Sequence, residues 1–241
     1  GIHSGDSIAV FPSYSLTKEQ QGQVLDFVKV ISKELDVHGL LNIQFVLRGG
    51  VFWIIEANPR ASRTVPIVSK ISKLPVIDMA VGIALGERLR DMPYGTGLYP
   101  ETGQWSVKVP VFSNDKLPGL DPKLGPRMMS TGESLGVADN LADAIMDGLK
   151  GSGWLPPATG RILMSIADSE KAEAMPVASQ YKMLGWEIDA TEGTAAYLKK
   201  WGIEVNRVER AELVRRLRGG EWDLVLNIPG GNERHMADGA M

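Results

Sequence analysis

The segment LLNIQFVLRGGVFWIIEANPR, residues 40–60, gives the clearest structural pattern in the first part of the chain. It holds two runs rich in apolar and β-branched residues, at 40–47 and 51–57, which are typical of strands. Between them lies Arg48-Gly49-Gly50, a sequence that favours a tight turn. The stretch therefore predicts an antiparallel β-hairpin.

The polar side chains of this hairpin are predicted to gather on one face. Because side chains alternate along a strand, Glu56 and Asn58 point the same way. A three-residue turn at 49–51 would place Gln44 opposite Glu56. All three side chains would then present oxygen atoms to the same space. Mg²⁺ prefers oxygen ligands and usually takes only a few from protein, so one carboxylate and two amides suit it.

Arg60 and Arg63 follow directly after the second strand of the hairpin. Guanidinium groups bind phosphate or carboxylate oxygens in a fork and keep their charge. Beside a metal ion they would stabilise charge on a transferring phosphoryl group. The residues alone leave a second interpretation open, in which Glu-x-Asn-Pro is only a turn and the arginines are solvated.

The composition limits the class of protein. The 241 residues include 44% hydrophobic and 23% charged residues, with a net charge of -3 and no cysteine. This predicts one large or two modest globular domains and no nucleic-acid or anionic membrane partner, and it excludes disulfides. No apolar run reaches about 18 residues, so no transmembrane helix is expected. The N-terminus lacks Met and resembles no signal peptide, which indicates a start inside a longer protein.

Two parts of different character follow from the pattern along the chain. In the first part, strands are expected at 7–11, 40–47, 51–57 and 104–111, and helices from Thr17 and at 75–85 and 141–149, with 117–130 irregular. After a linker at 151–157, strands at 161–166, 186–190 and 223–228 alternate with helices at 170–184, 194–201 and 211–218. That alternation predicts βαβ units and a parallel sheet, apparently cut short at the C-terminus.

The second part carries a candidate phosphate site. Thr191 and Thr194 lie where a strand turns into a helix, and backbone N–H groups and hydroxyls there favour a phosphate. Lys171 follows the preceding strand and would add a charge at the same rim. The alternative is that Thr191-Glu192-Gly193-Thr194 only starts a helix. The nearby arginines are expected to form a solvated helix face: Arg207, Arg215, Arg216 and Arg218.

Three polar residues, His3, Ser4 and Asp6, precede the first strand. They could contact a nucleotide or an effector, or form a solvated turn. His38 and His235 have no companions at metal-ligand spacing and are given no role.

Several longer motifs resemble one family, the large subunit of carbamoyl-phosphate synthase. They are GIHSGDS at 1–7, LNIQF at 41–45, EANPRASRTVP at 56–66, VKVPVFS at 107–113, DKLPG at 115–119, LGP at 124–126 and STGE at 130–133. The run SRTVP is similar to the second of that subunit's two ATP-grasp units, which phosphorylates carbamate. Beyond the linker, GRILMSI at 160–166, Lys171 and DATEGTA at 189–195 resemble its methylglyoxal-synthase-like regulatory domain.

The resemblance implies an α/β protein. Residues 1–150 would be an α+β ATP-grasp C-terminal lobe with an antiparallel sheet and a following helical segment. Residues 151–241 would be an incomplete, Rossmann-like regulatory domain with a parallel sheet. Gln44, Glu56 and Asn58 match metal ligands, and Arg60 and Arg63 match residues that handle phosphates and the carboxylate-like substrate. The nucleotide contacts implied are Gly1, Ile2, His3, Ser4, Gln44 and Glu56.

The resemblance also implies the chemistry and the partners. ATP with Mg²⁺ or Mn²⁺, and K⁺ as a further candidate ion, would phosphorylate carbamate to carbamoyl phosphate for pyrimidine and arginine biosynthesis in the cytoplasm. The partner would be a small glutamine amidotransferase subunit. A nucleotide effector, UMP or IMP, would bind at Lys171, Thr191, Thr194 and Arg210, and Asp6 would lie near an ornithine site. Arg210 stands where relatives commonly have Lys.

An expectation for the isolated chain and three rival interpretations remain at this point. Because no glycine-rich phosphate loop precedes Gln44, the isolated chain is expected to be an inactive ligase fragment. It could instead serve as a non-catalytic regulatory module that binds a nucleotide phosphate. Another ATP-grasp ligase, such as a biotin-carboxylase-like enzyme, is disfavoured by SRTVP and the appended domain, and methylglyoxal synthase activity by the resemblance to the regulatory branch.

Overall fold

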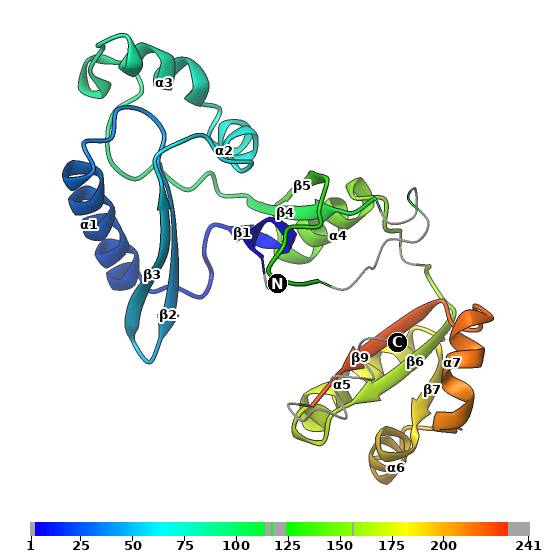
Figure 1. Cartoon of the computed structure of the whole chain (residues 1–241). Helices are drawn as coiled ribbons and strands as arrows, with labels where there is room; N and C mark the ends of the chain where they lie inside the picture. Colours follow the sequence, from blue (N-terminus) through cyan, green and yellow to red (C-terminus); the bar gives the residue numbers. More distant parts are fainter. Residues whose placement is uncertain (1–2, 114–116, 118–123, 156, 231–241) are drawn as a thin grey trace. The chain divides into compact units, whose positions relative to one another are not determined.

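The computed structural model describes residues 3–113, 117, 124–155 and 157–230. The chain forms two compact units, Gly1–Trp154 and Leu155–Met241. Figure 1 shows antiparallel strands in the first unit and a sheet flanked by helices in the second. Within the described residues, no helix is both long enough and apolar enough to cross a membrane.

The first unit holds two antiparallel sheets, β1-β4-β5 and β2-β3. Its elements in chain order are η1 (Ser4–Asp6), β1 (Ala9–Phe11), α1 (Lys18–Glu34), β2 (Asn42–Arg48), β3 (Val51–Asn58), α2 (Val65–Ser72), α3 (Val76–Ala84), η2 (Leu89–Asp91), β4 (Trp105–Val111), β5 (Gly132–Ala138) and α4 (Leu141–Gly151).

The hairpin β2–β3 confirms the predicted pairing of Gln44 with Glu56, but the predicted turn was wrong. Arg48 pairs with Val51, so the turn has two residues, and Gly49 and Gly50 supply the positive φ angles, 59° and 79°, that such a turn requires. The residue that the turn lacks is instead found further from the turn, within strand β3. Phe45 pairs with Ile54 and Gln44 with Glu56, which leaves Ile55 unpaired in a β-bulge.

Helix α1 begins at the capping box that the sequence predicts. Thr17 accepts a hydrogen bond from the Gln20 amide at 3.2 Å, and the Gln20 side chain accepts one from the Thr17 amide at 2.9 Å. From this helix Phe27 contacts Phe45 and Phe52 of the hairpin, with ring centroids 6.2 and 6.1 Å away. The aromatic cluster therefore fixes α1 on one face of the hairpin.

The core of the sheet β1-β4-β5 lies under α4, where Val107, Val109 and Ala144 are buried. The helix approaches β5 backbone to backbone at Gly136. A Cβ at that position would lie 2.0 Å from the Ala144 carbonyl oxygen and 2.4 Å from the Gly148 nitrogen. Strand β5 was not predicted, because its sequence GESLGVA has two glycines and few β-branched residues. Its pairing with β4 along the whole strand overrides that weak local preference.

The second unit confirms the predicted parallel α/β fold. Its four strands are parallel in the order β8-β7-β6-β9. The elements are β6 (Arg161–Ile166), η4 (Asp168–Glu170), α5 (Lys171–Met183), β7 (Glu187–Thr191), α6 (Glu192–Lys200), β8 (Asn206–Val208), α7 (Arg210–Arg218) and β9 (Leu224–Ile228). Sequence patterns missed β8, which is only three residues long, and α2 in the first unit.

Each face of this sheet has its own apolar cluster. The alternating residues Ile162, Met164 and Ile166 pack in one cluster with residues of α5 and α6. On the opposite face, Leu163 packs with Val208, Trp222 and Leu213 of α7. The side chains of β6 therefore point alternately into the two apolar clusters, as expected for a parallel strand covered on both faces.

A buried carboxylate, Asp189, anchors the face that α7 covers. It is 1% exposed and accepts hydrogen bonds from Asn206 at 3.0 Å, Arg216 at 2.9 Å and the Trp222 indole at 2.9 Å. Arg216 also donates to Glu221 and lies 4.7 Å from the centre of the Trp222 ring. The hydrogen bond to Glu221 raises the pKa of Arg216, burial opposes the shift, and Asp189 reinforces it.

The expectation that four arginines form a solvated helix face was wrong for two of them. Arg216 has a side chain only 16% exposed, because the Asp189 network draws it inward. Arg207 lies in β8 rather than on a helix, and it forms ion pairs with Glu192 and Glu209 at 2.9 Å each.

Candidate functional site

The end of the hairpin brings together the residues predicted to bind a metal. Gln44 pairs with Glu56, and Asn42 pairs with Asn58 two residues further along the strands. The Gln44 amide nitrogen donates to the Ser4 hydroxyl at 2.8 Å, so η1 lies beside the hairpin. This bond leaves the amide oxygen of Gln44 as the atom that could ligate a metal. Glu56 is exposed and accessible to a ligand.

The oxygen donors of this site fit a hard divalent cation. A carboxylate with two amide oxygens is a set that Mg²⁺ or Mn²⁺ accepts, with phosphate oxygens completing the shell. Among the described residues there is no group of three or more His, Cys, Asp or Glu side chains that could hold a metal.

The segment before β1 is an ordered single turn rather than a solvated one. His3 caps η1 by accepting a hydrogen bond on Nδ1 from the Gly5 amide at 3.0 Å. Asp6 is 5% exposed and accepts hydrogen bonds from the amides of Met129 at 2.9 Å and Ser130 at 2.8 Å. The structure thus gives Asp6 a structural role, and its placement near an ornithine site stays a prediction. The predicted contacts Gly1 and Ile2 lie outside the described residues.

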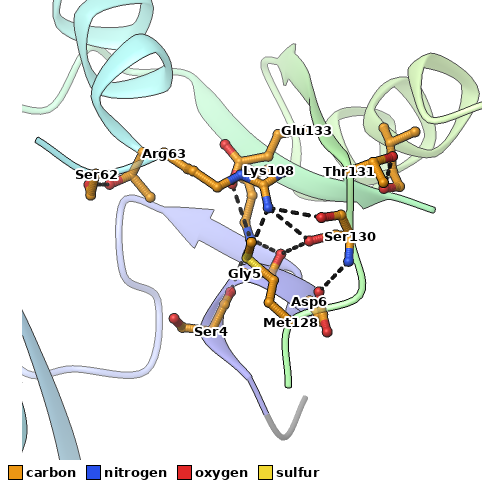
Figure 2. Close-up of polar contacts among 12 residues, drawn as sticks. Ser4, Gly5, Asp6, Ser62, Arg63, Lys108, Met128, Ser130, Thr131 and Glu133 are labelled. Carbon is orange, nitrogen blue, oxygen red and sulfur yellow. Dashed lines mark hydrogen bonds and ion pairs between the residues drawn. The ribbon is translucent and has the colours of Figure 1, made fainter. Parts of the chain in front are cut away.

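A buried polar cluster behind η1 contains residues to which the sequence assigned no role (Figure 2). The Lys108 ammonium, in β4, donates to the carbonyl oxygens of Ser4 and Gly5 at 3.2 Å each. It also lies 3.9 Å from the Glu133 carboxylate. The Ser130 hydroxyl donates to the Gly5 carbonyl at 3.1 Å. A lysine between Val107 and Val109 is typical of a solvent-facing strand position, which is why strand periodicity alone could not find it.

The two predicted phosphate-binding arginines do not share an environment. Arg63 donates to the Ser130 carbonyl at 3.2 Å and hydroxyl at 3.1 Å, and its Nε lies 3.9 Å from Glu133, so it belongs to the buried polar cluster (Figure 2). Arg60 is exposed and donates to the adjacent Ala61 carbonyl at 2.9 Å. It lines a cavity of about 430 Å³ with Asp36 and His38.

The surroundings of Lys108 and Asp6 lower the pKa of each group. Burial lowers the pKa of Lys108, and Arg63 adds to that effect, whereas Glu133 and Asp6 oppose it. For Asp6, burial alone would raise the pKa. Hydrogen bonds from Met129 and Ser130 outweigh burial and hold the pKa of Asp6 below its ordinary value of 3.8.

An Asp6→Asn variant is expected to be less stable than the parent near pH 6, with a gap that narrows as the pH falls below about 4. Since the pKa of Asp6 is lowered in the folded state, the unfolded chain binds its proton at a higher pH. The stabilisation is therefore fully present above pH 3.8 and is lost as the pH falls through the folded value. Urea unfolding followed by circular dichroism across this range measures it.

The control for this pH series is Asp26→Asn, because the Asp26 side chain is 74% exposed and forms an exposed ion pair with Lys29. Its stability should stay parallel to that of the parent at every pH. If the Asp6→Asn curve is equally parallel, the buried carboxylate does not carry the acid dependence.

The predicted effector residues of the second unit meet at the carboxyl edge of the sheet. Lys171 is buried, and its ammonium lies 3.1 Å from where a Cβ on Gly193 would stand, at the start of α6. The Thr194 hydroxyl accepts from the Ile166 amide at 3.0 Å, and Thr191 donates to Thr194 at 3.2 Å. Lysine, threonines and the start of α6 therefore converge where β6 and β7 end.

Other charges flank this edge. Lys171 forms an ion pair with Asp168, whose side chain is 95% exposed. Arg210 is the first residue of α7, directly after the end of β8, and is exposed. The four predicted effector residues of this unit thus lie at or after the ends of three parallel strands, β6, β7 and β8, at one edge of the sheet.

Comparisons with known proteins match both units. Residues 1–92 match the family model described as Carbamoyl-phosphate synthase L chain, ATP binding domain, and residues 173–241 match the MGS-like domain. The chain is 42% identical over 235 residues to the carbamoyl phosphate synthase large chain of Clostridium botulinum (strain Kyoto / Type A2), covering 95% of this chain and 22% of the relative. It is 41% identical over 229 residues to that of Thermoanaerobacter sp. (strain X514), covering 95% and 21%.

A solved long-chain acyl-CoA carboxylase is a much weaker match, at 14% identity and a TM-score of 0.45, over 60% of this chain and 18% of that one. A likeness at this level supports no conclusion.

The two units are therefore an ATP-grasp lobe, with its antiparallel sheets, and an MGS-like domain with a parallel sheet. The chain belongs to the carbamoyl phosphate synthase large chain family and corresponds to its C-terminal portion. It spans about a fifth of the length of the curated relatives it matches.

Proposed function

We propose that the first unit provides the metal-bearing part of a site that phosphorylates carbamate with ATP, giving carbamoyl phosphate and ADP. The observation that carries this proposal is the pairing of Gln44 with Glu56 beside Ser4, in a chain that matches carbamoyl phosphate synthase large chains. Such a large chain would serve pyrimidine and arginine biosynthesis in the cytoplasm and receive its substrate through a glutamine amidotransferase subunit.

Each candidate site residue of the first unit has a defined role in this proposal. Gln44, Glu56 and Asn58 would hold Mg²⁺ or Mn²⁺, and the bound ion would neutralise charge on the phosphates of ATP. His3 and Ser4, on η1, would contact the nucleotide. Arg60, which is exposed and donates only to its neighbour Ala61 among the contacts described, would turn toward the transferred phosphoryl group, whereas Arg63 is held by Ser130 and would act from a fixed position.

No general base is required for this chemistry, because carbamate is already an anion. The protein's contribution is then to position the reactants and to neutralise charge. The chain alone is proposed to bind nucleotide without completing the reaction, since it spans about a fifth of the length of the relatives it matches.

A second proposed function belongs to the second unit, which would bind the phosphate of a nucleotide effector such as UMP or IMP. The observation that favours it is the position of the Lys171 ammonium over Gly193, next to Thr191 and Thr194. A buried cation beside the start of a helix suits a phosphate dianion. The division into domains at 1–150 and 151–241 is part of this proposal, and the two compact units support it.

A Glu56→Ala variant is expected to bind Mg-ADP at least about tenfold more weakly than the parent, a change of about 1.4 kcal/mol, because it removes the carboxylate among the three ligands. Isothermal titration of the 241-residue chain with Mg-ADP measures this.

In the same experiment, Lys171→Met is titrated with UMP and with IMP. It should lower effector affinity and leave Mg-ADP affinity unchanged.

Glu34→Ala, an exposed carboxylate on α1, is the matched control for Glu56→Ala. The loss of Lys171 should cost little stability, because its partner Asp168 is exposed to solvent. Equal Mg-ADP affinity in Glu56→Ala and Glu34→Ala would refute the metal assignment. Effector affinity that does not respond to Lys171→Met would refute the second proposal.

A further inference from the structure

The Lys108 ammonium is a buried charge that the packing of its strand does not require. Its residue is 5% exposed, and the neighbouring Val107 and Val109 supply the apolar contacts with α4. Lysine is rarely buried, and burying its charge is costly unless the ammonium is paired and hydrogen-bonded. An apolar side chain of similar volume would fill the space without that cost. The charge of Lys108 is therefore accounted for by the contacts of its ammonium rather than by the packing of β4.

Those contacts set the orientation of the peptide group between Ser4 and Gly5. In a trans peptide the C=O of one residue and the N–H of the next point in opposite directions. The Ser4 carbonyl accepts from Lys108 at 3.2 Å, and the Gly5 amide donates to His3 Nδ1 at 3.0 Å. By holding one side of this peptide, Lys108 also holds the other side, where the His3 ring is fixed.

The same segment is connected to the hairpin through its side chain. The Ser4 hydroxyl accepts from the Gln44 amide at 2.8 Å, while the Ser4 carbonyl is held by Lys108. The next carbonyl, of Gly5, is also held by Lys108, with the Ser130 hydroxyl as a second donor. One ammonium in β4 thus holds the backbone of η1. The side chains of this turn include the proposed nucleotide contacts His3 and Ser4, and Ser4 is hydrogen-bonded to the proposed metal ligand Gln44.

Glu133 provides the charge that this arrangement needs. Its carboxylate is 3.9 Å from both the Lys108 ammonium and the Arg63 guanidinium, and its side chain is 10% exposed. It opposes the lowering of the Lys108 pKa that burial causes. The carboxylate that faces the ammonium behind η1 is therefore supplied by β5.

We propose that Lys108 is a positioning residue for the nucleotide and metal site: it holds the Ser4 and Gly5 carbonyls so that His3, Ser4 and Gln44 keep the arrangement that binds Mg-ADP. This role rests on the function proposed above for η1 and Gln44. Lys108 itself acts from behind the turn, through the backbone.

The test compares Lys108→Met, which has similar volume but no charge and no donor, with Lys108→Arg, which keeps both. Hydrogen exchange of the Gly5 and Ser7 amides in the 241-residue chain, read by NMR, reports the order of η1. Lys108→Met should accelerate exchange at least about tenfold and weaken Mg-ADP binding by about 10-fold to 100-fold. Lys108→Arg should restore both to within about threefold of the parent.

Lys150→Met is the control, because Lys150 lies on α4 with a side chain 52% exposed, and it should change neither measurement. Circular dichroism confirms that each variant is folded, and if Lys108→Met is not, Lys108→Gln is judged by the same criteria. A purely structural lysine would lower the melting temperature and leave the affinity of the folded protein intact.

The two possible failures are distinguishable. Exchange or Mg-ADP affinity in Lys108→Met equal to that in Lys150→Met overturns the positioning role while leaving the proposed function in place. Absence of Mg-ADP binding in the unaltered chain refutes the proposed function, and the positioning role with it.

Discussion

A Gly136→Ala variant is expected to lose about 3 kcal/mol or more of stability in the first unit, at or beyond the upper end of the usual range for overpacking. The added Cβ would stand 2.0 Å from the Ala144 carbonyl oxygen and 2.4 Å from the Gly148 nitrogen. Both are backbone atoms of α4, so no side chain can rotate away to make room. The helix would have to move off β5, and the buried contacts of Val107 and Val109 would open with it.

The same strand provides the matched control, Gly132→Ala. A Cβ there would lie 3.5 Å from the Val111 Cβ, an ordinary contact distance. Urea denaturation followed by circular dichroism should show a large drop in midpoint for Gly136→Ala and a small change for Gly132→Ala. Equal midpoints for the two variants would show that α4 does not pack on β5 at this distance.

An Asp189→Ala variant is expected to destabilise the second unit by about 3–5 kcal/mol, the cost of removing one partner of a buried ion pair. The substitution leaves the Arg216 guanidinium, the Trp222 indole N–H and the Asn206 amide without their shared acceptor. Arg216 would keep its ion pair with Glu221, but its guanidinium is mostly buried against the Trp222 ring and could replace the lost acceptor only by disturbing the packing of α7.

Tryptophan fluorescence during urea unfolding measures this change, since Trp186 and Trp222 are both buried in the second unit. Glu173→Ala, at an exposed position of α5, is the control and should shift the midpoint little. A loss below about 1 kcal/mol for Asp189→Ala would mean that the network is replaceable by water, against the buried geometry.

Local pattern was sufficient for features that depend on neighbouring residues. The capping box of Thr17 and Gln20, the hairpin and the strand–helix alternation of the second unit all follow from short-range spacing. The pairing of Gln44 with Glu56 was also correct, although it arose from two errors of one residue that cancel. A two-residue turn replaces the three-residue turn, and the bulge at Ile55 adds the residue back.

Features that depend on distant segments could not be predicted in this way. Asp6 is buried because the amides of Met129 and Ser130 reach it from more than a hundred residues along the chain. Lys108 is buried for a related reason, since η1 covers it. No periodicity in the flanking sequence carries this information.

The bulge at Ile55 has a further consequence for how this hairpin can vary. Phe45, Phe52 and Ile54 share the face turned toward α1, and regular pairing would have put Glu56 on that same apolar face. Because Ile55 is unpaired, the alternation of side chains between the two faces shifts by one residue after it. Glu56 and Asn58 therefore lie on the face opposite to Phe52 and Ile54. The tip beyond it can therefore lose or gain whole residue pairs without disturbing the carboxylate, whereas deletion of Ile55 alone would turn the carboxylate inward.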